Sequence, residues 1–196
     1  MEESSRWYPG AGLYRPVTLI TTGSCAFEEW SINVVTKEIN PLKHTATIEV
    51  TASANGYYSD KNHIRVATHG QEHTLPIINA DCLGLVTAQG QIKLDNVAFW
   101  TPERPQLYSM TLSIEDENGN TLDKKTIRYG VRTVAVDAKG FRLNGKLRKI
   151  RGVCLHHDLG MLGAAINKSA LAHQIRLLKS MGCDAIRTSH NMPSQS

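Results

Sequence analysis

Apolar and polar residues alternate along most of this chain, and that period of two constrains the fold more than any other feature. Between about residues 23 and 136 the alternation runs through short segments rich in Thr, Val and Ile, as in half-buried strands. These segments are Ser31–Thr36, Thr45–Ala52, His63–Thr68, Gln91–Val97, Tyr108–Glu115 and Thr121–Tyr129. Roughly seven short strands in about 110 residues predict an immunoglobulin-like β-sandwich over residues 23–136. The Cys…Trp…Cys pattern of antibody domains is not evident, so we expect a sandwich without that disulfide.

Turn signals and one isolated strand accompany this region. An Asn-Gly pair lies in Glu117–Asn120, between two predicted strands, and another lies in Phe141–Lys146, so both stretches predict tight hairpins. Leu13–Thr21 reads as a strand with no neighbour to pair with. We therefore interpret residues 1–22 as the tail of a preceding domain.

After Val136 the hydrophobic period changes. Residues 149–155 read as a strand, residues 168–181 carry apolar side chains on one helical face, and residues 183–188 read as a second strand. Asn167 or Ser169 can cap the start of the helix, and Gly182 suits the position after its end. The order strand, helix, strand predicts one βαβ unit of parallel strands with a right-handed crossover.

Composition excludes several classes of protein. No run approaches the eighteen apolar residues of a membrane span, and the start lacks an apolar signal-peptide core, so a signal would lie upstream if the parent protein is exported. The four cysteines share no CxxC spacing, which disfavours a zinc ribbon or a redox pair and favours free thiols. We predict a soluble chain that needs no cofactor and no metal.

Charge is unevenly distributed along the chain. From Val136 onward there are ten Lys and Arg against three Asp, although the whole chain carries only +4. Nucleic-acid binding would suit such a basic segment. These cations, however, lie between apolar positions rather than beside exposed aromatic residues. We therefore expect no nucleic-acid partner, and acidic partners in sequence outside this chain.

Polar residues collect where the two strands of the βαβ unit end. The first strand runs into His156, His157 and Asp158, and the second ends in the polar run Arg187–Asn191. Because adjacent parallel strands lie about 4.8 Å apart, the two groups should face a common space. Such groups suit a hydroxyl-rich ligand or a carboxylate that must be held still, although loop residues of this kind also have purely structural roles. A metal site is disfavoured, because adjacent His156 and His157 point apart on an extended backbone.

These strings also resemble a known family. Residues 152–158 (GVCLHHD) and 185–191 (AIRTSHN) are similar to the opening of the catalytic barrel in glycoside hydrolase family 2, which contains β-galactosidases, β-glucuronidases and β-mannosidases. Residues 5–15 resemble the end of its N-terminal jelly roll, and residues 100–108 a stretch of its immunoglobulin-like domain. Residues 129–133, with 141–146, resemble the join into the barrel.

The resemblance implies a mainly β chain with three domain segments. Residues 1–22 would be the C-terminal tail of a jelly-roll sugar-binding domain, 23–136 the immunoglobulin-like sandwich, and 137–196 the truncated start of a (β/α)8 TIM barrel. The family's retaining mechanism uses two glutamates from later barrel strands. This chain has no Glu after Glu117 and only three Asp from residue 137 on, so we expect no catalytic residue in it.

A sugar-binding shell is what the resemblance transfers. His156 and His190 match histidines that line the sugar subsite, and Arg187 matches an arginine that supports the nucleophilic glutamate. Asp158 matches a frequently acidic position nearby, and Asn191 belongs to the same motif. Cys154-Leu155-His156-His157 stands where better-known members have Asn-Arg-His-Glu, so the sugar preference does not transfer.

Two functions follow from the sequence. The first is a fragment of a retaining glycosidase acting on terminal β-linked sugars, with a β-galactoside as the expected substrate and the fragment itself inactive. The second is a β-sandwich carbohydrate-binding or adhesion module without catalysis.

In either case the βαβ unit lacks neighbours to bury it. We expect it to be locally disordered, to dock on the sandwich, or to self-associate through its exposed face.

Overall fold

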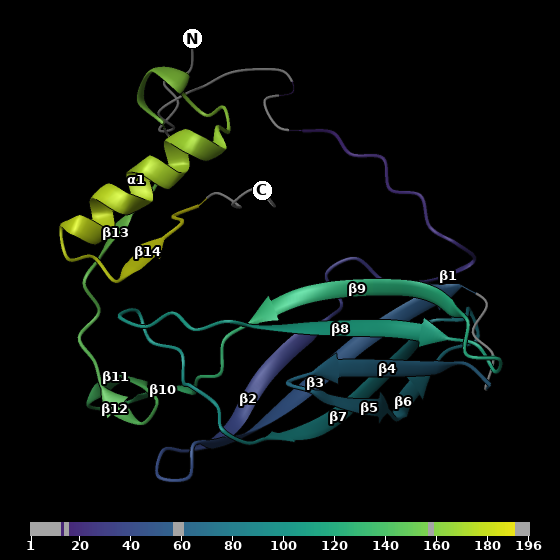
Figure 1. Cartoon of the computed structure of the whole chain (residues 1–196). Coiled ribbons are helices and arrows are strands. Elements are labelled where there is room, and N and C mark those ends of the chain that lie inside the picture. Colours follow the sequence, from purple (N-terminus) through teal and green to yellow (C-terminus); the bar gives the residue numbers. More distant parts are fainter. Residues whose placement is uncertain (1–12, 14–15, 57–60, 157–158, 191–196) are drawn as a thin grey trace. The chain divides into compact units, whose positions relative to one another are not determined.

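The computed structural model describes residues 13, 16–56, 61–156 and 159–190 of the chain (Figure 1). They form two compact units: Thr21–Arg148 is one, and the described residues before Thr21 and after Arg148 belong to the other. In the described part of the chain, no helix is long and apolar enough to cross a membrane.

The larger unit is built from two antiparallel sheets (Figure 1). One sheet contains β1 (Cys25–Phe27), β2 (Asn33–Asn40), β3 (Thr45–Gly56), β6 (Ile77–Ala80) and β7 (Val86–Leu94). The other contains β4 (His63–Thr68), β5 (Gln71–Leu75), β8 (Tyr108–Glu115) and β9 (Thr121–Tyr129). A small third sheet follows, made of β10 (Val134–Asp137), β11 (Gly140–Leu143) and β12 (Lys146–Leu147). The predicted mainly β fold is confirmed.

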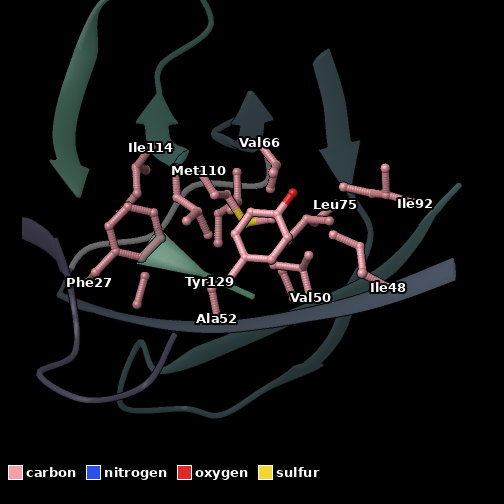
Figure 2. Close-up of a cluster of buried hydrophobic side chains, with 14 of the residues drawn as sticks. Phe27, Ile48, Val50, Ala52, Val66, Leu75, Ile92, Met110, Ile114 and Tyr129 are labelled. Carbon is pink, nitrogen blue, oxygen red and sulfur yellow. The ribbon is translucent and has the colours of Figure 1, made fainter. Parts of the chain in front are cut away.

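The core lies where alternate side chains of the two sheets meet (Figure 2). Every second residue of β3 from Ala46 to Ala54 is buried, and β8 buries Met110, Leu112 and Ile114 in the same rhythm. Each fully buried aliphatic side chain contributes about 1.5–3 kcal/mol. Tyr129 closes the core, with its hydroxyl 2.8 Å from Thr68 Oγ1, and burial raises the pKa of that hydroxyl. The alternation in the sequence therefore marks the inward faces correctly.

Some predicted strand limits are wrong. Leu13 and residues 16–21 form no strand, because no neighbouring strand pairs with them and their apolar side chains remain exposed. The strand predicted at Gln91–Val97 is β7, which starts at Val86 and ends at Leu94, before Asn96 takes a φ of +54° that a strand does not accommodate. Ser31–Thr36 likewise shifts to Asn33–Asn40.

The chain changes sheet at Pro76. Leu75, the last residue of β5, pairs with Ile64 of β4, whereas Ile77, the first residue of β6, pairs with Ala88 of β7. Proline suits this position because it has no backbone N–H to leave unpaired where the ladder breaks. The two short strands on either side of Pro76 join the sheets.

Both predicted hairpins are present. Asn144 and Gly145 have φ of +51° and +76° between β11 and β12, as the two-residue turn requires. Between β8 and β9 the Asp116 carboxylate accepts hydrogen bonds from the backbone N–H groups of Asn118 and Asn120. These turns fix the register of the strands that they join.

The smaller unit contains the predicted βαβ arrangement. Its elements are β13 (Gly152–Cys154), a 3₁₀ turn η1 (Gly160–Leu162), α1 (Lys168–Ser180) and β14 (Ala185–Arg187). β13 and β14 pair in parallel, as predicted, but both are shorter than the segments 149–155 and 183–188. Asn167 caps α1 by accepting from the backbone N–H of Ala170. At the other end, Gly182 at φ +86° donates to the carbonyl of Lys179, which completes a glycine-terminated helix end.

Gly56 is expected to be the least replaceable glycine of the sandwich. It has a φ of +98°, and a Cβ atom there would lie 1.7 Å from the carbonyl oxygen of Ser24. Gly56→Ala should lower the free energy of unfolding by about 4 kcal/mol, combining left-handed strain with overlap against backbone. Gly119→Ala is the matched control: its φ is +80° with nothing within 4 Å, so strain alone should remove about 1–2 kcal/mol. Urea unfolding measures both, and equal losses would contradict the packing argument.

Candidate sugar-binding site

The smaller unit brings together the polar residues that follow its two strands. Cys154 at the end of β13 is the register partner of Arg187 at the end of β14. The pairing continues one residue further, where the backbone N–H of Leu155 donates to the carbonyl of Arg187 at 2.9 Å. Because the strands are parallel, the residues that follow them emerge at the same edge of the sheet.

His156 and His190 meet at this edge. Their ring centroids are 6.0 Å apart and the ring planes cross at 66°, an edge-to-face arrangement. Of the five residues expected in the binding shell, His156, Arg187 and His190 therefore lie in one small region. Asp158 and Asn191 fall outside the described residues, as does His157. The binding role of all five stays a prediction.

Cys154 is a neighbour that sequence reasoning did not identify. The Arg187 Nη1 donates to Cys154 Sγ at 3.9 Å, and both side chains are exposed. Sulfur is a weak acceptor, so this contact leaves the other donors of the guanidinium available for a carboxylate. The pair follows from the register of two short parallel strands, which no sequence motif specifies.

Neither of the described carboxylates nearest in sequence is part of this edge. Asp184 accepts from the backbone N–H of Arg151 at 2.9 Å, which places it before the start of both strands. Asp137 belongs to the other unit and accepts from Arg142 Nε at 2.6 Å, and this hydrogen bond holds the pKa of Asp137 below its ordinary value. The described residues also offer no group of three metal ligands. The edge can therefore hold hydroxyls or an anion, but its described part supplies no acid for catalysis.

Comparison with known proteins identifies the family. Residues 28–132 match the family description "Glycosyl hydrolases family 2", and residues 134–196 match the TIM barrel domain of the same family. The chain belongs to glycosyl hydrolase family 2. The β13–α1–β14 unit thus lies in the stretch that corresponds to the start of the family's TIM barrel, as predicted.

Individual relatives agree with this assignment. A β-galactosidase from Bacteroides ovatus is 35% identical over 98% of this chain, and a β-glucuronidase from Sus scrofa is 30% identical over 92%. The crystal structure of a β-glycosidase from Bacteroides vulgatus superposes with a TM-score of 0.79 at 32% identity, over 96% of this chain and 24% of that one. The family 2 chain spans only 23% and 27% of the two curated relatives.

Proposed function

We propose that the protein to which these residues belong hydrolyses terminal β-linked sugars, with a β-galactoside as the main substrate. The observation that carries the proposal is the edge where β13 and β14 end, with two imidazole rings 6.0 Å apart beside an exposed guanidinium. Imidazoles bind sugar hydroxyls as donors or acceptors, and the fixed fork of Arg187 suits a carboxylate. Family membership supplies the reaction class.

In this proposal each residue of the edge has one role. His156 and His190 bind hydroxyls of the sugar, Asp158 and Asn191 add further contacts to it, and Arg187 holds the glutamate nucleophile of a later barrel strand. Galactoside is placed before glucuronide because the B. ovatus β-galactosidase is 35% identical to the chain, slightly above the 33% of a putative β-glucuronidase from Formosa agariphila. The 196-residue chain by itself is inactive, since it has no Glu after Glu117.

The test uses the protein encoded by the complete reading frame that contains these residues. We expect kcat/KM for a nitrophenyl β-galactoside to exceed that for the β-glucuronide. Arg187→Lys should lower kcat/KM about 10- to 100-fold, because lysine loses the bidentate hydrogen bonds to a carboxylate. Arg176→Lys, on exposed α1, is the control and should change nothing. An Arg187→Lys enzyme with unchanged kcat/KM would contradict the role of Arg187.

The rival function, a binding or adhesion module, predicts a different sequence downstream of Ser196. A glycosidase requires further barrel strands downstream with an Asn-Glu pair at a strand end. A frame that stops after Ser196 with nothing barrel-like beyond favours the module.

A further inference from the structure

A groove in the sandwich unit, separate from the βαβ edge, has the features of a second ligand site. Its volume is about 840 Å³, within the range of pockets that hold drug-sized ligands. Three segments line it: the turn after β2, the stretch between β7 and β8, and the β11–β12 hairpin. Figure 1 shows the β2–β3 turn and the small β10–β12 sheet at the same end of the sandwich.

The groove is preformed, because hydrogen bonds tie these segments together. The backbone N–H of Val97 donates to the carbonyl of His44 at 2.8 Å. Asn144 Nδ2 donates to the carbonyl of Trp100 at 3.1 Å, which holds the β11–β12 hairpin against the stretch between β7 and β8. Arg148 Nη2 lies 2.7 Å from Glu103 Oε1, and this ion pair joins the end of the hairpin to the stretch between β7 and β8. A preformed groove binds a ligand without an ordering penalty of its own.

The lining is basic. Lys43, Arg104 and Lys146 all line the groove, and none of the three has a side-chain partner within the described residues. The acid among the lining residues, Glu103, is already paired with Arg148, whose hydrogen bond holds the pKa of Glu103 below its ordinary value. Unpaired cations in a preformed groove favour an anionic ligand.

Two rings add an apolar surface to this basic lining. His44 and Phe99 lie nearly parallel, with centroids 6.2 Å apart and planes at 8°, and both line the groove. The negative face of an aromatic ring attracts weakly positive C–H groups, which one face of a pyranose ring presents. Cations beside an aromatic face therefore suit a sugar ring that carries a carboxylate.

We propose that this groove binds an acidic oligosaccharide, with uronate carboxylates on Lys43, Arg104 and Lys146 and a pyranose face against Phe99. Its role is to hold a charged glycan on the sandwich, and it does not depend on the activity proposed for the barrel. An acidic peptide would satisfy the cations but not the ring surface, so the carbohydrate is the better match.

The experiment titrates the 196-residue chain with trigalacturonate and follows its backbone amides by NMR. We expect chemical-shift changes in residues 41–44, 96–104 and 143–148, and an affinity that decreases with added salt. Neutral galactotriose should bind at least about tenfold more weakly than trigalacturonate. The double variant Arg104→Gln/Lys146→Gln should weaken trigalacturonate binding about tenfold, at roughly threefold per exposed charge. Lys93→Gln removes an exposed cation of β7 outside the groove and should leave the affinity unchanged.

Several results would overturn the proposal. They are absence of binding, shifts confined to His156 and His190, equal affinity for the neutral sugar, and equal weakening by Lys93→Gln. Equal affinity for a glutamate oligomer of the same charge would show a general anion site instead. The unfolding midpoint of each variant, measured in urea, separates lost binding from lost folding.

Discussion

Backbone amides in residues 149–190 are expected to exchange with solvent at least about a thousandfold faster than those in the centre of β3, β4 and β8. The described residues of this stretch include none that is buried, and Ile150, Ile175 and Met181 are 50%, 44% and 73% exposed. Ordering each residue costs about 1–2 kcal/mol, and a side chain must be fully buried to return about 1.5–3 kcal/mol. The sandwich has such side chains, and the βαβ unit does not.

The size of the difference follows from the stability of the sandwich. Its central amides exchange only through global opening, which requires about 5–15 kcal/mol, whereas weakly packed segments open at close to zero. Each 1.4 kcal/mol is a factor of ten, so about 5 kcal/mol separates the rates by more than three decades.

Hydrogen exchange measured at two protein concentrations tests this expectation. The exposed apolar face should promote self-association, so protection in residues 149–188 should increase with concentration and sedimentation should show larger species. Slow exchange throughout residues 149–188 in a dilute monomer, without contacts to the sandwich, is the contradicting result.

The parts of the fold that the sequence predicts are those with local signals. β3 and β8 are recognisable because their alternation continues over several residues, and the hairpin at Asn144-Gly145 because its turn needs positive φ. β1, β5 and β6 have three to five residues, too few for a period to emerge. Their pairing depends on β3, β4 and β7, so no local pattern reveals it.

In the candidate site, too, the sequence predicts one contact and not the other. Parallel strands of known order predict that the residues following them meet, and His156 and His190 do meet. The Cys154–Arg187 contact depends on the register, which the sequence does not specify to one residue. A thiol beside a guanidinium also matches no familiar motif, so nothing in the string itself selects it.

The 196-residue chain is expected to leave aryl β-glycosides intact, and the reason is chemical. Cleaving an acetal requires a proton for the leaving oxygen and a nucleophile or activated water at the anomeric carbon. His156 or His190 could at most act as a general acid toward the leaving oxygen. General acid help of this kind is worth about 10²–10⁴-fold, well below the 10⁶-fold or more that is typical of enzymes.

Charge at the edge where β13 and β14 end lowers the expected rate further. The transition state carries positive charge on the sugar ring, and a carboxylate normally stabilises it. Among the described residues of this unit, the carboxylate of Asp184 lies before the start of the strands, and the guanidinium of Arg187 at the edge opposes that charge. The difference between such a site and a complete family 2 enzyme should be at least about 10²-fold even with perfect proton donation.

The absence of the catalytic acids from these residues is tested by turnover of a nitrophenyl β-galactoside by the purified 196-residue chain. We expect a rate equal to that of buffer alone, for the galactoside and also for the corresponding glucuronide and mannoside. Steady turnover that survives a second purification, and that disappears in His156→Ala or Asp158→Ala, would contradict it. That result would mean that the acids of the reaction lie within these residues.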